Sequence, residues 1–319
     1  MRLPTLASLS VFVGALAVIL LAGVLCVLYG ILIERRWYRA RRYRVPVLEP
    51  GSGTPLTVLH LSDLHMVARD DAKVRFLASL PAPDVAVVTG DFLGEPDAVE
   101  RVLEALRPLR GRLASYFVLG SNDLYAPKPL NYASYFMETR PKRTSVRGRD
   151  ADLRQGLMDD GWIDLDNHRA ELAVNGSRLE VMGMHDPHIQ LADLRLAPRR
   201  DAGVVGLAVV HSPDPAPELA AFGWDLILTG HTHGGQVRMP LVGALVTNSH
   251  IPTRLCRGLS LLPPAVLHVS PGLGTSKYAP FRFLCRPEAT ILDLVPRRDP
   301  EGAAVVSGAA VARIDPSTG

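Results

Sequence analysis

Five short runs of β-branched and apolar residues, each ending in polar residues, constrain the fold of this chain most strongly. Runs of this length and composition are typical of buried strands. Helix-like stretches at 72–80 and 96–109 separate the first three runs. Because strands and helices alternate, we predict an α/β fold built from βαβ units. The runs are LTVLHLSD (56–63), DVAVVTGD (84–91), SYFVLGSND (115–123), GLAVVHS (206–212) and DLILTGH (225–231).

Weaker patterns complete the folded part. The segment 172–184 predicts a hairpin with Asn175-Gly176 as its turn, and 152–162 predicts a short helix. The apolar runs ALVTN, AVLHVSPG and EATILDLV follow the fifth run and indicate further strands, which would form a second sheet. The polar stretch KPLNYASYFMETRPKRTSVRGRD predicts a surface excursion.

One uncharged stretch, residues 9–33, precedes the folded part. It is about as long as the ~20 residues that cross a bilayer as a helix. It is too long for a signal-peptide core and has no small-x-small cleavage pattern, so we favour a single-pass transmembrane anchor over a cleaved signal. Glu34 and six arginines at 34–44 follow it with a net charge of +5. By the positive-inside rule this predicts a cytoplasmic domain at the cell membrane, and the opposite topology stays open.

The predicted domain limits follow from these patterns. The anchor and its arginine-rich flank occupy 1–44, a Pro/Gly linker 45–55, the folded domain 56–296 and a disordered tail 297–319. The chain carries +3 in total, so the part outside the arginine cluster carries −2, which argues against a nucleic-acid partner. No CxxC pair exists, and we favour separate buried thiols at Cys256 and Cys285 over a disulfide.

Residue types that bind metals stand at the ends of the predicted strands, where α/β sheets place their ligands. Asp63 and His65 are two positions apart and point the same way on an extended chain. Gly90 allows a tight turn, so that the Asp91 carboxylate can bridge two cations. Imidazole-rich sites suit Mn, Fe, Zn or similar ions better than Ca or Mg. The predicted ligands of two divalent metal ions are Asp63, His65, Asp91, Asn122, His211, His231 and His233.

The order of these motifs resembles the calcineurin-like metallophosphoesterase superfamily. LSDLH, VVTGD and LTGHTHGGQ carry the resemblance, and GLGTSKYAPFRFLCRPEATIL is similar to its bacterial membrane-linked branch. The resemblance covers roughly residues 56–294. It implies a four-layer α/β/β/α sandwich, here preceded by one transmembrane helix, with Asp91 bridging two ions. One ion would be held by Asp63, His65 and His233, and the other by Asn122, His211 and His231.

One segment departs from the superfamily pattern Gly-Asn-His-Asp/Glu, because the chain has Gly-Ser-Asn-Asp. Without a gap Ser121 takes the ligand position, and with a shift of one residue Asn122 does. We favour Asn122 because an amide oxygen is a better ligand than a neutral hydroxyl. The histidine that protonates the leaving group is then missing. We predict that Asp123 or His188 replaces it, with His185 and a leaving group that needs no acid as alternatives.

The predicted function is metal-dependent hydrolysis of phosphate esters, by a phosphodiesterase or phosphomonoesterase. Two neighbouring cations lower the pKa of a shared water, which makes hydroxide available for attack on phosphorus. Gly234 and Gln236 are predicted to admit the substrate phosphate, and a tight turn explains them equally well. The anchor suggests a membrane-proximal substrate, including a lipid-linked one. The alternative is a non-catalytic scaffold that binds phosphate or a protein; a nuclease is disfavoured by the near-neutral domain.

Overall fold

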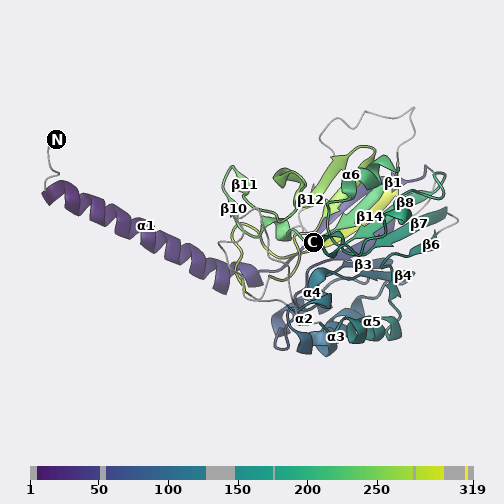
Figure 1. Ribbon diagram of the computed structural model, residues 1–319, viewed down its shortest axis with the longest axis horizontal. Coiled ribbons are helices and arrows are strands. Elements are labelled where there is room, and N and C mark those ends of the chain that lie inside the picture. The colour runs from purple at the N-terminus through teal and green to yellow at the C-terminus, as the bar shows by residue number, and fades with distance from the viewer. Residues whose placement is uncertain are drawn as a thin grey trace.

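The computed structural model contains a folded domain and one long N-terminal helix (Figure 1). The predicted turn at Asn175-Gly176, most of the polar excursion and nearly all of the tail lie outside the described residues. The described residues are 6–50, 55–126, 148–174, 177–275, 278–297 and 313–314.

The first sheet has the strand order β15-β1-β14-β2-β3-β4-β5. Helices α2, α3 and α5 cover its outer face, where they share one apolar core with the strands. Strands β2 to β5 are parallel, and β14 runs antiparallel to β2. The bounds are β1 Arg39–Leu48, β2 Leu56–Leu61, α2 Asp71–Ala78, β3 Val85–Thr89, η2 Pro96–Ala98, α3 Val99–Leu106, η3 Arg107–Leu109, β4 Ala114–Val118, α4 Ser121–Leu124, α5 Asp150–Asp159, β5 Ile163–Asp164, β14 Glu288–Pro296 and β15 Arg313–Ile314.

The second sheet has the order β12-β13-β9-β8-β7-β6 and packs face to face on the first. Helix α6 and short 3-10 turns cover its outer face. The result is the α/β/β/α sandwich that the motif resemblance implied. The bounds are β6 Arg169–Val174, β7 Ser177–Met184, η5 Pro187–Ile189, η6 Leu194–Leu196, β8 Val205–Val210, α6 Ala216–Ala221, β9 Leu226–Thr229, η7 His233–Gly235, β10 Arg238–Met239, β11 Gly243–Ala244, η8 Thr253–Leu255, β12 Gly258–Leu262 and β13 Ala265–Val269.

All five predicted strand runs form strands, namely β2, β3, β4, β8 and β9. The composition of the second sheet differs from the prediction. EATILDLV forms β14, which lies in the first sheet between β1 and β2, and the predicted hairpin supplies β6 and β7 of the second sheet. Only the first residue of ALVTN lies in a strand, β11.

Residues 39–48 were predicted as flank and linker, but they form β1, which pairs with β14 in parallel. Alternate residues of β1 enter the core between the sheets, among them Tyr43 and Val45. Arg39 and Arg41 pair with the buried Glu288, and Arg42 pairs with Asp293. The linker prediction was therefore wrong for 45–48. Three arginines of the predicted flank form ion pairs within the first sheet.

Helix α1 (Leu6–Leu32) is a candidate membrane span, and the most apolar part of Val11–Arg36 has no buried residue. Its C-terminal end docks on the domain. Tyr29 meets Phe283 edge to face at 6.2 Å, and the carbonyl of Gly30 accepts from the backbone N–H of Arg282. The carboxylate of Glu34, only 2% exposed, accepts from the backbone N–H of Cys285 at 2.5 Å. These contacts fix the anchor relative to the sandwich.

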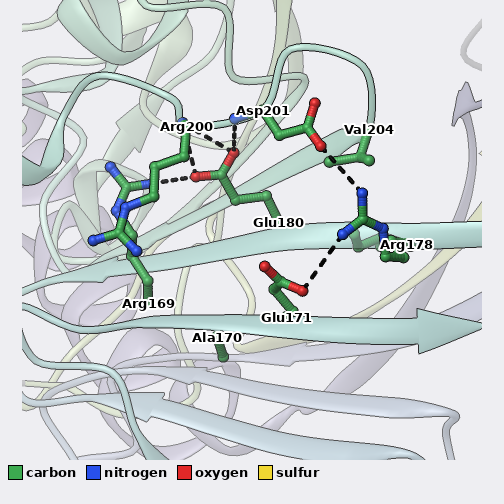
Figure 2. A pocket seen from close by; sticks show the side chains of 9 residues that line it. Arg169, Ala170, Glu171, Arg178, Glu180, Arg200, Asp201 and Val204 are labelled. Atoms are coloured by element: carbon green, nitrogen blue, oxygen red, sulfur yellow. Dashed lines mark hydrogen bonds and ion pairs between the residues drawn. The ribbon is translucent and has the colours of Figure 1, made fainter.

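A pocket lies over β6 and β7, at the edge of the second sheet (Figure 2). Most of its charged side chains pair with one another. Glu180 pairs with Arg169 and accepts from the backbone N–H of Asp201. Arg178 lies between Glu171 and Asp201. Because these charges satisfy one another and no predicted ligand lines the pocket, we assign this surface a structural role.

Two histidines face each other inside the sandwich. The Nδ1 atoms of His60 and His268 are 2.7 Å apart, and Nε2 of His60 lies 2.9 Å from Oγ1 of Thr89. Both rings are fully buried. Burial lowers the pKa of His60 well below its usual value, and burial with the charge of Arg41 lowers the pKa of His268 to about 3. The pair therefore folds in its neutral form.

This pair predicts a loss of stability in acid. Because an unfolded histidine titrates near pH ~6.5, the unfolded chain binds more protons than the folded protein below that pH. The free energy of unfolding should fall as the pH drops from about 6.5 toward the low folded pKa values. We expect the double variant His60→Leu/His268→Leu to fall less steeply, measured by urea denaturation in detergent. His268→Leu alone leaves His60 without its partner and should cost about 1–3 kcal/mol. An unchanged slope in the double variant would contradict this assignment.

Candidate metal centre

The segments that follow β2, β3, β4, β8 and β9 meet at one edge of the sandwich. Each carries predicted ligand residues, and the structure brings all of these residues together. Asp63 and His65 follow β2, Asp91 follows β3, Asn122 lies in α4 after β4, His211 follows β8, and His231 and His233 follow β9.

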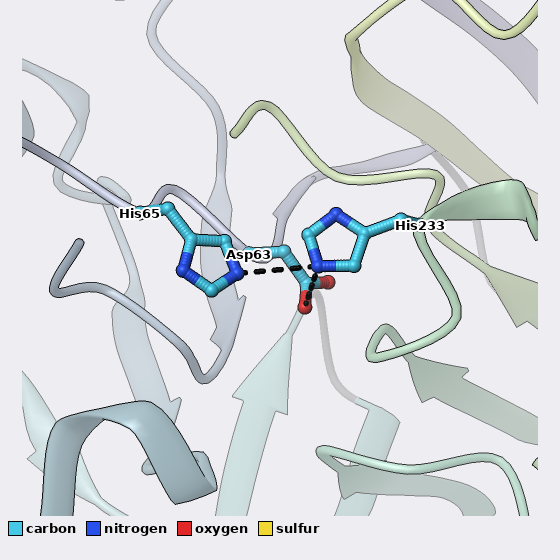
Figure 3. A group of neighbouring side chains, drawn as sticks. All are labelled: Asp63, His65 and His233. Carbon is cyan, nitrogen blue, oxygen red and sulfur yellow. Dashed lines mark hydrogen bonds and ion pairs between the residues drawn. The ribbon is translucent and has the colours of Figure 1, made fainter. Parts of the chain in front are cut away.

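Asp63, His65 and His233 form the first group (Figure 3). One ligand atom from each lies within 4.8 Å of the others. Nε2 of His65 is 3.2 Å from Nε2 of His233, which is 3.6 Å from Oδ1 of Asp63. Two ring nitrogens and a carboxylate oxygen thus face one point, as the ligands of a metal ion do.

Asp63, Asp91 and His211 form the second group, again within 4.8 Å of one another. Nδ1 of His211 lies 2.7 Å from the carbonyl of Thr89, and Nε2 of His231 lies 3.2 Å from a backbone carbonyl. In a neutral ring these nitrogens carry the proton. Nε2 of His211 and Nδ1 of His231 then face each other as lone pairs 3.3 Å apart. They need a positive charge between them, from a proton or a metal ion.

Asp91, a member of the second group, also approaches the first group. Its Oδ2 is 3.6 Å from Nε2 of His65, and its Oδ1 is 3.6 Å from Nε2 of His211. One carboxylate oxygen thus faces a histidine of each set. Asn122 holds this carboxylate, since its backbone N–H donates to Oδ1 at 2.9 Å and its side-chain amide donates to Oδ2. The amide nitrogen therefore faces Asp91, and a ligand role for the amide oxygen requires the amide to turn.

Asp63 supplies a direct test of whether this donor set fits a cation. Its side chain is fully buried, and Oδ2 accepts from Ser62 Oγ and from the backbone N–H of His231. Oδ1 is buried and has no hydrogen-bond partner in the described part of the chain. A buried carboxylate oxygen without a partner is costly. A cation in the first group would provide this partner, so the residues fit a bound metal.

The backbone is strained at most of these positions. A positive φ is uncommon for residues other than glycine and costs on the order of 1–3 kcal/mol at functional sites. Such conformations persist only where the surrounding structure enforces them. Here they turn the side chains toward a common point. Positive φ occurs at Asp63 (47°), His65 (39°), Asp91 (55°), His231 (66°) and His233 (50°).

The electrostatics of the cluster favour a cation. Although burial acts in the opposite direction, the charges of Asp91, Asp186 and Asp63 raise the pKa of His211 to about 10. Burial raises the pKa of Asp63 to about 7, and the charge of Asp91 adds to this effect. The metal-free site therefore takes up protons where a metal ion would otherwise neutralise it.

Comparison with known proteins agrees with this geometry. The family model described as calcineurin-like phosphoesterase matches residues 56–235 of the 319-residue chain. The chain belongs to this family. The family is metal-dependent and hydrolyses phosphate esters, so this phosphoesterase is a hydrolase.

The similar proteins include enzymes and membrane proteins. Phosphodiesterase YaeI of Escherichia coli (strain K12) is 27% identical over 82% of this chain and 90% of its own length. A transmembrane protein with a metallophosphoesterase domain from Bos taurus is 31% identical over 77% of this chain and 54% of its own length. UDP-2,3-diacylglucosamine pyrophosphatase LpxG of Chlamydia trachomatis is 27% identical over 74% of this chain and 83% of its own length.

Asp123 does not face the ligand cluster of this phosphoesterase. Its carboxylate is fully buried. Oδ2 accepts from the backbone N–H groups of Asp91 and Gly120, both at 2.9 Å, and Oδ1 accepts from that of Leu93 at 3.0 Å. Both oxygens thus bind the backbone and join the loops after β3 and β4. The geometry does not support the prediction that Asp123 protonates the leaving group.

His188 lies directly against the cluster. Its ring stacks on that of His231 with centroids 4.1 Å apart. Nε2 of His188 is 3.0 Å from Oδ2 of Asp214 and 3.1 Å from Oγ of Ser212. Burial tends to raise the pKa of Asp214. The hydrogen bonds from His188, Ser249 and the His250 backbone outweigh this effect and hold the pKa below its usual range. Asp214 thus remains an anion beside His188.

Gly234 and Gln236 shape the turn after His233. Gly234 has φ of 62°, and a Cβ there would approach Sγ of Cys285 to 2.8 Å. The side-chain amide of Gln236 donates to the carbonyl of Ala279 at 2.8 Å. These contacts favour the tight-turn interpretation over substrate binding. Cys285 is a free buried thiol, as is Cys256, in agreement with the prediction.

Arg282 was not predicted from the sequence. It packs against His233 of the first group. This arginine is fully buried. Its guanidinium donates to the carbonyls of Pro271, Gly274 and Cys285, and Nη2 lies 3.4 Å from Nδ1 of His233. It therefore fixes the position of the His233 ring. The only sequence signal was its place in the membrane-linked motif, since no pattern distinguishes a buried arginine from a surface one.

The electrostatics of this centre predict proton release on metal binding. Because His211 is protonated in the metal-free protein, binding of Mn²⁺ or Zn²⁺ must displace that proton. We expect the affinity to rise as the pH rises from about 6 toward the pKa of His211, which is raised to about 10. Calorimetry in two buffers of different ionisation enthalpy measures the released protons.

Asp91→Asn should lose most of this affinity, because an amide cannot offer two anionic oxygens to both groups. Asp293→Asn is the matched control, since Asp293 binds only the first sheet. Tight binding by Asp91→Asn, or affinity independent of pH, would contradict the assignment.

Proposed function

We propose that this phosphoesterase hydrolyses phosphodiesters at a membrane surface, with two divalent metal ions of the Mn, Fe or Zn type. The observation that carries the proposal is the position of Asp91. Its two oxygens face His65 and His211, which belong to separate donor groups, each at 3.6 Å. A carboxylate in that position suits two neighbouring cations better than one.

The two donor groups support a distribution of the ligands between two ions. Asp63, His65 and His233 would hold the first ion, and the convergence of their donor atoms supports this. The second ion would be held by Asn122, His211 and His231, and Asp91 would bind both. When bound, such ions polarise the phosphate oxygens and activate water for attack on phosphorus. Backbone carbonyls accept from Nδ1 of His211 and Nε2 of His231. These hydrogen bonds orient the two rings so that their other nitrogens face the site before any ion binds.

His188 is our candidate for the general acid in place of the missing motif histidine. It lies beside the second donor group, and only part of its side chain is exposed. Since Nε2 is engaged by Asp214 and Ser212, Nδ1 would deliver the proton to the leaving alkoxide. Asp214 would orient the ring and stabilise its protonated form, as a carboxylate does in other acid–base pairs.

Location suggests the substrate. The candidate span α1 docks on the domain, and LpxG relatives carry a name that specifies a diacylated sugar nucleotide. We infer a membrane-proximal or lipid-linked phosphate ester. The arginines after α1 favour a cytoplasmic domain. Because β1 belongs to the first sheet, we place the start of the catalytic domain at Arg39 and its end near Arg297.

Hydrolysis of bis-p-nitrophenyl phosphate tests the function. We expect the full-length protein in detergent to turn over this diester with added Mn²⁺ and to lose activity with a chelator. Asp91→Asn should be inactive, whereas Asp293→Asn should match the wild type. Absence of turnover with any of Mn²⁺, Fe²⁺ or Zn²⁺ would favour the alternative of a non-catalytic scaffold.

The dependence of rate on the leaving group tests His188. An acid matters most when the leaving group is basic. His188→Asn should therefore slow release of a simple alcohol on the order of 10²–10⁴-fold, and slow p-nitrophenol much less. His250→Asn is the matched control, because His250 contacts the same Asp214 but is exposed. Equal losses with both leaving groups would exclude His188 as the acid.

A further inference from the structure

The hairpin formed by β10, β11 and the residues after it presents an apolar surface to solvent. It begins at Arg238, five residues after the ligand His233, and extends to Val246. Soluble proteins seldom expose so many apolar side chains within one short segment. The exposed side chains are Met239 (49%), Leu241 (108%), Val242 (67%), Leu245 (55%) and Val246 (51%).

We propose that residues 239–246 insert their apolar side chains into the bilayer that α1 spans. The hairpin would then be a second membrane contact of the domain. It would hold the metal centre at the level of the lipid headgroups.

Contacts place the hairpin at the same end of the domain as α1. Val237 forms a parallel bridge with Phe283, and the backbone N–H of Arg238 donates to the carbonyl of Phe283 at 2.9 Å. The ring of Phe283 in turn packs on Tyr29 near the end of α1. Figure 1 shows β10 and β11 at the side of the domain from which α1 departs. The bilayer around α1 therefore faces the hairpin.

Apolar residues next to the anchor continue this surface. Leu32 (61% exposed) ends α1, and Ile33 (53%) and Trp37 (51%) follow it. Leu284 (46%) follows Phe283, which contacts both α1 and the hairpin. The backbone N–H of Leu284 donates to Glu34, just after α1. Tryptophan at this position is typical of the membrane interface. The exposed apolar groups thus come from two segments, joined through residues 283 and 284.

The charge of the region fits an anionic lipid surface. Residues 226–287 contain no Asp or Glu, whereas they include several arginines. Arg254, which is exposed, lies in η8, and η8 packs against β11 at the base of the hairpin. Basic residues beside an apolar membrane contact bind anionic headgroups. A stretch without acidic residues avoids repulsion from the same headgroups.

The hairpin also bears on the substrate, and this step rests on the proposed function. Only the turn 234–237 separates the hairpin from His233. A phosphodiester at the metal centre could therefore keep a long alkyl chain against the apolar hairpin. The substrate class that fits is an amphiphilic phosphate ester that stays in the bilayer.

Depth-dependent quenching tests the membrane contact without any need for catalysis. The full-length protein carries Cys26→Ser and Leu241→Cys, labelled with an environment-sensitive fluorophore; the remaining cysteines are buried. It is reconstituted in phosphatidylcholine vesicles that contain phosphatidylglycerol. The matched control is Leu194→Cys, a leucine that is 57% exposed in η6, which packs on β7 near the other edge of the second sheet.

The expected result separates the two labels. The label at position 241 should shift to the blue, be quenched by nitroxide lipids and be protected from iodide. The label at position 194 should remain accessible to iodide. Equal iodide quenching at both positions overturns the proposal. Protection at position 241 without lipid quenching, together with cross-linking between two copies of the chain, also overturns it, because the hairpin then binds a second copy.

A pair of substrates tests the second step. Hexadecyl p-nitrophenyl phosphate in vesicles and ethyl p-nitrophenyl phosphate in water share one leaving group. The variant Leu241→Glu/Val242→Glu should lose most activity on the hexadecyl ester and retain wild-type activity on the ethyl ester. Equal activity of variant and wild type on the hexadecyl ester overturns the substrate class. Failure of the wild type on both esters refutes the proposed function instead, while the quenching result still decides the membrane contact.

Discussion

The structure depends on a concentration of like-charged and lone-pair groups at one edge of the sandwich. Asp63 and Asp91 are buried beside four imidazoles, and Oδ1 of Asp63 has no hydrogen-bond partner in the described part of the chain. Such a cluster is unfavourable in the absence of positive charge. The strained φ angles at the same residues add to its cost. A cation bound there would offset this cost, and the surrounding sheets supply the rigidity that holds the donors in place.

Backbone contacts around the cluster show how that rigidity is achieved. Asp123 joins the loops after β3 and β4, because its carboxylate accepts N–H groups from Asp91, Leu93 and Gly120. Its two carboxyl oxygens therefore stabilise the turn that presents Asp91, although burial raises the pKa of Asp123 to about 8. The residue that the sequence offered as a catalytic acid thus holds the loop that carries Asp91.

The sequence predicted the convergence of the candidate ligands better than it predicted their surroundings. Strands such as β2 and β9 are mostly apolar and are followed within two residues by a candidate ligand, so their identity and the direction of their ends follow from local pattern. Strand β1 was not predicted because its arginines mask the alternation of buried and exposed residues. Tyr43 and Val45 face the core, but Arg42 and Arg44 flank Tyr43, and further arginines precede them. The acidic partners of these arginines are distant in sequence. Asp293, the partner of Arg42, lies 251 residues away, so no local pattern reveals the pairing.

A similar separation in sequence explains why the contact between α1 and the candidate metal centre could not be predicted from the sequence. The carbonyl of Gly30 accepts from the backbone of Arg282, and the guanidinium of Arg282 lies beside the His233 ring. A Cβ at position 30 would approach the Arg282 carbonyl to 2.6 Å, so the helix must present a glycine to come this close. Helix α1 is therefore more than an extension of the domain. Its last turn supports the loop that positions the candidate ligand His233, and the orientation of the helix and the geometry of the donor cluster are parts of one packed unit.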